Sequence, residues 1–246
     1  NEDKPWMYAD EQQVIDTLEP IGADIIISAS YGQKIPSKTI HDVKFGGINI
    51  HPSILPRWRG GDPVPWAIMT GDAQIGVTVG TLSEAFDAGR ILAQKKIPIK
   101  VTDTSGPLRT ALFTIGATVL ADLLPDFIAG KIKGRTQQAV DQPRAKRLTR
   151  DIGFEPWESI QNAQNTGTDA ARIERKFRAL TPWPGVWTLI SQGSQEQAQK
   201  RLKVLALHVD NGKLTIDDVQ LEGKNPTSFI QFRASYLPDV PPGDAS

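Results

Sequence analysis

Cysteine is absent from the 246 residues of this chain, and histidine occurs only three times. Without cysteine there are no disulfides, iron–sulfur clusters, thiolate metal sites or cysteine nucleophiles. With so few histidines the sequence predicts no histidine-rich metal site, and we expect no bound metal. The formal net charge is zero, because 28 basic residues balance 28 acidic ones. This balance excludes a surface that is basic throughout, but it allows a local basic patch.

Long apolar runs are also lacking. No stretch approaches the roughly 20 consecutive apolar residues that span a bilayer, and no secretory signal opens the chain. Hydrophobic residues make up 39% and charged residues 23%, which is typical of a soluble globular protein. We therefore expect a cytoplasmic protein. The first residue is Asn1 rather than methionine, so we expect that residues upstream have been removed.

The first half of the chain alternates strand and helix signals, which indicates an α/β fold. The segments that predict strands are 24–30, 47–51, 76–82 and 91–99. The first of them contains three consecutive isoleucines and suits a strand buried on both faces, as in a parallel sheet. The segments that predict helices are 11–18, 63–70 and 105–124. In the last of these, apolar residues recur every three or four positions and predict one buried helix face.

The composition changes after residue 130. Segment 131–150 carries seven basic residues against one acidic residue, which is typical of a linker between domains. Beyond it the sequence predicts one helix over 169–180. The segments that predict strands there are 186–190, 201–209, 213–220 and 228–234. Short strands with a hairpin signal at Asn211-Gly212 indicate a small β-barrel domain.

These boundaries predict three parts: a first domain over 1–130, a basic linker over 131–150 and a second domain over 151–246. The residues from 238 onward are expected to form a frayed tail.

Asn49 and His51 lie two residues apart on a predicted strand, so their side chains point to the same face. Ligands of open α/β sheets bind at the carboxyl ends of strands, where this pair lies. The amide can donate to a developing oxyanion, and the imidazole can move a proton near neutral pH. A sharp turn at Asp87 would return a carboxylate to the same end. Ordinary alternatives stay open: a histidine satisfied by backbone, a cap at Asn49 and a plain turn at Asp87.

The stretch from Asn49 to Gly60 resembles the signature of the 10-formyltetrahydrofolate-dependent formyltransferases. Those proteins share the pattern Asn-x-His-x-Ser-Leu-Leu-Pro, then a glycine, and a second block with an Asp-x-Gly turn. Here the first block ends at Pro56 and has Ile54 in place of the first leucine, and the second block is Asp87-Ala88-Gly89. Further matching segments are 30–36, 103–106, 146–150 and 182–185. These favour the branch that formylates the amino group of methionine on initiator tRNA for translation initiation.

The resemblance implies a Rossmann-like formyltransferase domain with a mostly parallel sheet, here N-terminally incomplete. A small OB-like β-barrel domain that contacts tRNA would follow it. The formyl donor would be 10-formyltetrahydrofolate, and the reaction would need no metal. By resemblance Asn49 holds the oxyanion, His51 assists it and moves protons, and Asp87 orients the histidine or shuttles protons through water. The residues that would line the folate site are Ser53, Ile54, Leu55 and Pro56.

Basic residues near these motifs predict an electrostatic track for tRNA phosphates. The candidates are Arg57, Arg59, Arg144, Lys146, Arg147, Arg172 and Arg175. The ordinary alternative is that charged linkers and helix faces are only solvated. Trp183 and Trp187 are expected to pack in a core or domain interface rather than to stack on bases.

Members of this family normally carry several tens of residues before the position of Asn1. A sheet without its first strands exposes an unpaired edge and an uncovered apolar face. We therefore expect this chain alone to be oligomeric, compensated in another way, or poorly active. Two other functions stay open. One is formyl transfer to an amino sugar nucleotide, and the other is a truncated, non-catalytic fragment that binds folate or tRNA.

Overall fold

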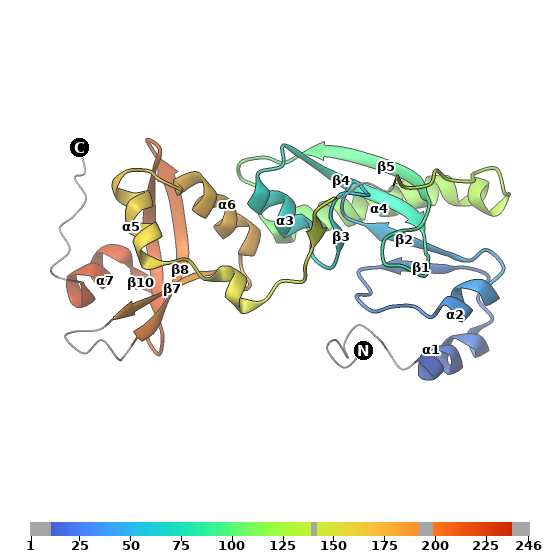
Figure 1. The fold of residues 1–246 in the computed structure, drawn as a ribbon, viewed down its shortest axis with the longest axis horizontal. Helices are drawn as coiled ribbons and strands as arrows, with labels where there is room; N and C mark the ends of the chain where they lie inside the picture. The colour runs from blue at the N-terminus through green and yellow to red at the C-terminus, as the bar shows by residue number, and fades with distance from the viewer. Residues whose placement is uncertain (1–10, 139–141, 192–198, 238–246) are drawn as a thin grey trace. The chain divides into compact units, whose positions relative to one another are not determined.

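The computed structural model describes residues 11–138, 142–191 and 199–237. Contacts divide the chain into two compact units, each with its own sheet (Figure 1). The first unit consists of Asn1–Ala67, Asp72–Val101 and Gly106–Arg147. The second unit consists of Ile68–Gly71, Thr102–Ser105 and Leu148–Ser246.

A four-stranded sheet in the order β1-β2-β4-β5 forms the centre of the first unit. Its strands are β1 (Ile26–Ala29), β2 (Gly47–His51), β4 (Gln74–Thr81) and β5 (Ile91–Pro98). Strand β1 pairs with β2 in parallel, whereas β2 with β4 and β4 with β5 pair antiparallel. The described part of this sheet is therefore mixed, and the expected α/β class is confirmed by the helices that accompany it.

The helices of the first unit follow the expected pattern, with one addition. They are α1 (Glu11–Leu18), α2 (Ser37–Asp42), α3 (Pro63–Thr70) and α4 (Ser105–Ile128), and a short 3-10 turn, η2 (Glu19–Ile21), follows α1. The sequence pattern did not indicate α2, because six residues are too few to display a helical period.

Helix α4 is long and apolar enough, by length and composition, to cross a membrane. It nevertheless packs on the sheet of the first unit, where Leu112 is fully buried. A Cβ at Gly116 would lie 2.4 Å from a methyl carbon of Ile50 and 2.8 Å from one of Val77, so helix and sheet approach closely there. One side of α4 therefore lies on the sheet, whereas only 22% of its most apolar window is buried, and length and composition alone are weak evidence for a membrane span.

The segment expected as a linker differs from that expectation. Strand β6 (Arg144–Ala145) pairs in parallel with β3 (Arg59–Gly60), and Arg135 forms a bridge with Ile91. Because of these pairings the contacts place residues up to Arg147 in the first unit. The backbone of this segment is paired with the first unit at two places, while its basic side chains are mostly exposed to solvent.

The second unit holds a four-stranded antiparallel sheet in the order β10-β9-β8-β7. Its strands are β7 (Val186–Ser191), β8 (Gln199–Asp210), β9 (Lys213–Leu221) and β10 (Thr227–Ser228). The β8–β9 hairpin turns at Asn211 and Gly212, which both have positive φ, as the sequence predicted. No pairing among the described residues closes this sheet into a barrel, so the barrel stays a prediction.

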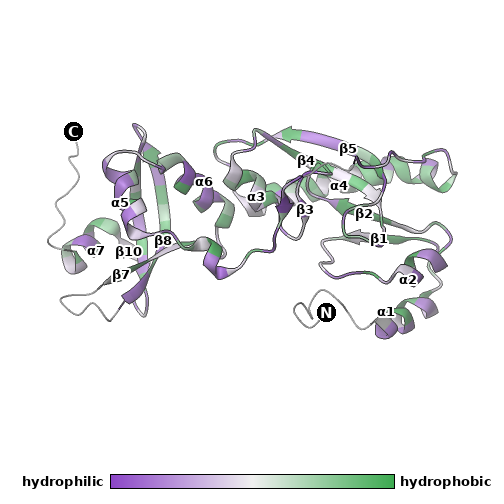
Figure 2. Ribbon diagram, in the orientation of Figure 1, coloured by the Kyte–Doolittle hydropathy of each residue, from purple (hydrophilic) through white to green (hydrophobic). Residues whose placement is uncertain are grey.

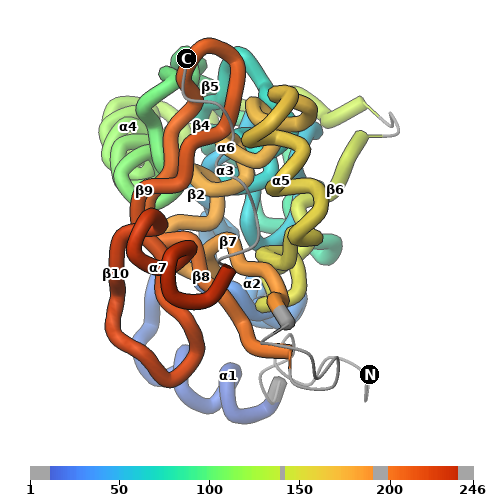
Figure 3. Tube along the Cα trace, turned by 90° about the vertical axis from the view of Figure 1, so that its left-hand side faces the viewer, coloured from blue at the N-terminus to red at the C-terminus, as the bar shows by residue number. Residues whose placement is uncertain are grey.

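Three helices cover this sheet, and a 3-10 turn, η3 (Arg150–Gly153), precedes them. They are α5 (Trp157–Asn165), α6 (Ala170–Leu180) and α7 (Phe229–Tyr236). Helix α6 shows hydrophilic and hydrophobic residues together, as expected for one buried face (Figure 2). Helix α7 lies beside β10 in both ribbon and tube views (Figures 1 and 3).

The strand predicted over 228–234 is wrong, because this segment forms α7. The Ser228 side chain accepts a hydrogen bond from the Gln231 N–H and so caps the helix. Phe229 and Phe232 then lie three positions apart and are both buried in the core of the second unit. The predicted tail from residue 238 lies outside the described residues.

Candidate active site

One cavity of about 420 Å³ collects the polar residues that the sequence singled out. Asn49 and His51 reach it from the end of β2, and Asp87 reaches it from the turn between β4 and β5. The charged residues that line this cavity are Lys34, Arg59, Asp62, Glu84, Asp87, Arg109, Arg144, Lys146 and Arg147. The structure therefore places an amide, an imidazole and a carboxylate in one partly enclosed space.

His51 is buried, with 5% of its surface exposed, and both ring nitrogens have neighbours. Nε2 lies 2.9 Å from the carbonyl oxygen of Trp58. That oxygen can only accept, so it fixes a proton on Nε2. Nδ1 lies 3.4 Å from Oδ1 of Asp87. Nδ1 therefore faces the carboxylate, and a proton can be held between Nδ1 and Oδ1 or passed from one to the other.

Asp87 lies in a turn with little conformational freedom. Its φ is +54°, a left-handed value that few non-glycine residues adopt. Oδ1 accepts from the Asn49 amide at 3.3 Å, and Oδ2 accepts from the Gly60 N–H at 2.8 Å. At Gly89 a Cβ would lie 1.8 Å from the Thr81 carbonyl oxygen, so only glycine fits. The Asp-Ala-Gly pattern thus follows from the close approach of this turn to the strand beside it.

The backbone that contacts His51 is held by a second network. Arg57 donates to both carboxylate oxygens of Asp72, at 2.9 and 2.7 Å, and its guanidinium lies 4.5 Å from the centre of the Trp58 ring. The Trp58 indole also donates to Asp72 at 2.8 Å. Hydrogen bonding to Asp72 raises the pKa of Arg57 further above its ordinary value. The network holds Trp58 at a φ of +61°, with its carbonyl toward His51.

The four residues predicted to line the folate site do not line this cavity. The preceding Pro52 lines it, whereas Ser53, Ile54, Leu55 and Pro56 do not. Ser53 is fully buried and donates to the Arg57 carbonyl at 2.7 Å. The Leu55 N–H donates to Thr78 Oγ1 at 3.1 Å. These four residues form the turn that leads to Arg57 and Trp58, and their contact with a folate stays a prediction.

Two family models match the chain. "Formyl transferase" matches residues 6–124, and "Formyl transferase, C-terminal domain" matches residues 167–217. A methionyl-tRNA formyltransferase from Streptococcus thermophilus is 33% identical over 230 residues, which are 87% of this chain and 71% of that protein. The chain belongs to the formyl transferase family. A second relative, the methionyl-tRNA formyltransferase of Listeria welshimeri, is 34% identical over 216 residues.

That second alignment covers 88% of this chain and 62% of the Listeria protein, so the chain spans less than two thirds of that relative. Solved formyltransferases share the fold. A methionyl-tRNA formyltransferase from Clostridium thermocellum has a TM-score of 0.63 at 15% identity, over 87% of this chain and 84% of that one. A sugar N-formyltransferase from Shewanella sp FDAARGOS_354 has a TM-score of 0.60 at 23% identity, over 74% and 70%. The fold alone does not distinguish the acceptor.

The structure separates the predicted basic residues of this formyl transferase into two groups. Arg59, Arg144, Lys146 and Arg147 line the cavity, together with Arg109, which the sequence did not single out. The remaining three candidates, Arg57, Arg172 and Arg175, do not line it. Arg57 is paired with Asp72, and Arg172 in the second unit is paired with Glu155 and Asp169. Within the described residues no group of three metal-ligating side chains occurs.

Besides Arg109, sequence reasoning missed two groups that hold the Asp87 turn. The Gly60 N–H holds Asp87, and the Gln137 side chain contacts the same turn. The sequence gives no signal for the role of the Gly60 N–H, because every non-proline residue carries a backbone N–H. Gln137 lies in the segment whose basic composition indicated a linker, and that composition obscured it.

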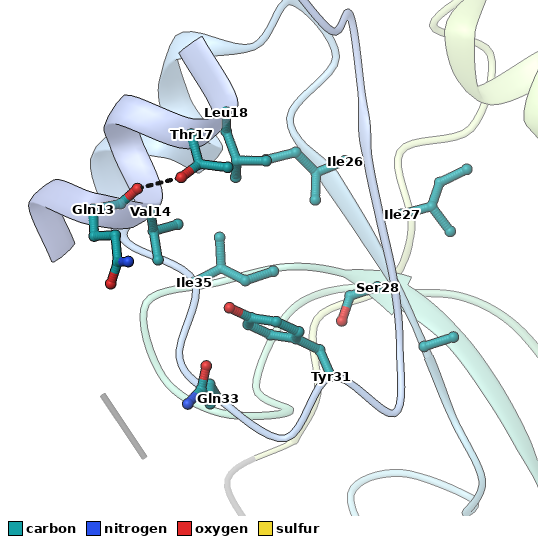
Figure 4. A pocket seen from close by; sticks show the side chains of 11 residues that line it. Gln13, Val14, Thr17, Leu18, Ile26, Ile27, Ser28, Tyr31, Gln33 and Ile35 are labelled. Atoms are coloured by element: carbon teal, nitrogen blue, oxygen red, sulfur yellow. Dashed lines mark hydrogen bonds between the residues drawn. The ribbon is translucent and has the colours of Figure 1, made fainter. Parts of the chain in front are cut away.

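A second, more apolar groove lies beside the edge strand β1 (Figure 4). Figure 4 shows Tyr31 and Ile35 in the space between α1 and β1, with Val14 and Leu18 on the helix side. Neither Asn49, His51 nor Asp87 lines it. The groove shares Ser28, Tyr31, Gln33 and Ile35 with the first cavity but reaches none of those three residues.

Proposed function

We propose that this chain transfers the formyl group of 10-formyltetrahydrofolate to the amino group of methionine esterified to initiator tRNA, in the cytoplasm. One observation carries the proposal. Asn49, His51 and Asp87 meet in one cavity, in a chain about a third identical to proteins named methionyl-tRNA formyltransferase. Because the chain spans only part of those relatives, donor, acceptor and activity all belong to the proposal and each needs its own measurement.

Formyl transfer sets three tasks. The amine attacks the formyl carbon, the carbonyl oxygen gains negative charge, and a proton leaves the amine and reaches the departing nitrogen. The Asn49 amide has two N–H groups and gives one to Asp87, so the second can donate to the oxyanion. His51 and Asp87 can share a proton between Nδ1 and Oδ1, and this pair can give a proton to the reacting nitrogens or take one from them.

The cavity suits a flat donor of moderate size. Its volume of about 420 Å³ lies in the range of small-molecule sites. Ile40, Leu82 and Phe86 provide apolar lining, and Asn49 and Asp87 provide polar groups beside it. We propose that a folate ring system lies against this apolar lining, with its formyl group toward Asn49.

Arg144, Lys146 and Arg147 line the same cavity, and we propose that they contact phosphates near the acceptor end of the tRNA. Arg57 and Arg172 serve ion pairs within their own units, and their contact with phosphate stays a prediction. The contribution of Arg59 and Arg175 stays a prediction as well.

Reversing all three cavity charges, Arg144→Glu, Lys146→Glu and Arg147→Glu, should weaken tRNA binding. The slope of log affinity against log salt should become flatter by about 0.7 to 0.9 for each phosphate that is no longer neutralised. Filter binding across salt concentrations measures both quantities. The matched control reverses Lys95, Lys96 and Lys133, whose side chains are exposed and do not line the cavity. An equal change in the control, or an unchanged slope in the first variant, would contradict the proposed phosphate binding.

The function is tested by supplying 10-formyltetrahydrofolate with either methionyl initiator tRNA or an amino sugar nucleotide. Formylation of the tRNA alone supports the proposal, and formylation of the sugar alone overturns the acceptor. Donor binding by calorimetry without transfer to either acceptor would identify a non-catalytic binding fragment.

A further inference from the structure

Gln137 joins two segments that are far from it in the sequence. Its Nε2 donates to the carbonyl oxygens of Asp87 and Gly89, both at 2.8 Å. Its Oε1 accepts from Nε and Nη2 of Arg59, at 3.0 and 2.6 Å. A guanidinium only donates and a carbonyl only accepts, so these partners fix the orientation of the amide. Both ends of the side chain are therefore satisfied, and exchanging them would break every bond.

These bonds hold the turn that carries the catalytic carboxylate of the family. Asp87 has positive φ, a strained conformation that persists only where its surroundings determine it. Gln137 holds the Asp87 backbone, and the Gly60 N–H holds its carboxylate. Arg59, the partner of Gln137, directly precedes Gly60 in β3. Backbone and side chain of Asp87 are thus both fastened to the same short strand.

We infer that Gln137 is a positioning residue for formyl transfer: it holds the turn of residues 87–89 so that the Asp87 carboxylate meets His51 and Asn49. Gln137 does not line the cavity, so it acts through Asp87. The kinetic part of this inference rests on the proposed function. The structural part, the distance between Asp87 and His51, does not.

The decisive variant is Gln137→Glu, which keeps the size of the side chain and its bond to Arg59. It replaces the donating nitrogen with an oxygen that faces two carbonyl oxygens, so the turn must shift. We expect kcat to fall about 10- to 100-fold, because small misplacements of catalytic groups have effects of this size. KM for the donor and the tRNA should change little. Gln138→Glu is the matched control, since Gln138 is the adjacent residue and is exposed.

A nuclear magnetic resonance measurement tests the positioning without any turnover. The chain has three histidines, so its ring nitrogen signals are few, and comparison with His51→Gln identifies those of His51. Gln137→Glu should shift the His51 ring signals, because the carboxylate beside Nδ1 moves. Gln138→Glu should leave them unchanged. If Gln137→Glu fails to give a folded melting profile, Gln137→Met removes the same donor without adding charge.

Coupling to Asp87 separates a positioning role from general destabilisation. In an Asp87→Asn background, Gln137→Glu should lower kcat no further. Additive losses, unchanged His51 signals, or wild-type kcat in the single variant would each overturn the inference. A chain that formylates neither acceptor would refute the proposed function, and the His51 signals would still decide whether Gln137 positions Asp87.

Discussion

Replacing His51 with alanine should lower kcat for formyl transfer about 100- to 10,000-fold, the usual contribution of a positioned proton-transfer group. The imidazole lies between the Trp58 carbonyl, which faces Nε2, and the Asp87 carboxylate, which faces Nδ1. Alanine removes both interactions, so neither the attacking amine nor the leaving nitrogen has its proton carrier. Single-turnover transfer from 10-formyltetrahydrofolate to methionyl initiator tRNA measures this step, and donor affinity should change much less.

Two further variants make that result interpretable. His51→Gln retains an N–H that can donate to the Trp58 carbonyl, but it cannot carry a proton between groups, so its activity should fall as far as that of the alanine variant. His41→Ala changes an exposed histidine in α2 and should transfer formyl groups at the wild-type rate. Turnover at the wild-type rate in either His51 variant would rule out the role assigned to the imidazole.

Much of the first unit could be predicted from local sequence patterns. Strand β2 and helix α3 begin and end where the sequence predicted, because alternation, a helix-compatible proline and a preceding acidic residue are all local signals. The meeting of Asn49 with His51 follows from strand geometry. Their approach to Asp87 was anticipated because Gly89 marks a sharp turn.

Non-local contacts explain what could not be predicted. The linker over 131–150 was expected from charge alone, but β6 within it is defined by pairing with β3, more than 80 residues earlier. The same holds for Gln137, whose partners are 48 to 78 residues away. The strand predicted over 228–234 is wrong although Phe229, Phe232 and Tyr236 recur at the helical spacing of three and four residues. The segment is short and rich in aromatic residues, which favour strands, and this obscured its helical period.

The second large effect concerns stability, and it arises at Glu155 in the second unit. Glu155 is 2% exposed, yet it accepts from Arg172 and from Lys176, the latter at 2.8 Å. Its own N–H donates to the Trp187 carbonyl at 2.8 Å. The buried carboxylate of Glu155 thus fastens the start of the second unit to α6, and its backbone N–H fastens the same residue to β7. Replacing it with glutamine removes the charge and leaves two cations facing a neutral group.

We expect Glu155→Gln to lower the free energy of unfolding of the second unit by about 3 kcal/mol, since breaking one partner of a buried ion pair leaves uncompensated charge. Urea unfolding followed by tryptophan fluorescence measures it, because several tryptophans lie in this unit. Glu158→Gln is the matched control: it makes the same chemical change at an exposed position in α5. Equal midpoints for the two variants would contradict the expectation.

The pH dependence of unfolding gives an independent test of the same interaction. Burial alone would raise the pKa of Glu155, but hydrogen bonds from Arg172 and Lys176 outweigh it and lower that pKa below its ordinary value of 4.5. A carboxyl with a depressed folded pKa adds stability above its unfolded pKa and loses it as pH falls toward the folded value. The wild-type second unit should therefore lose stability on acidification below about pH 5 more steeply than Glu155→Gln does. If the unfolding free energies of the two proteins change with pH in parallel, the Glu155 carboxylate does not titrate differently in the folded and unfolded states. Its ion pairs with Arg172 and Lys176 would then contribute little to holding α6 against the start of the unit.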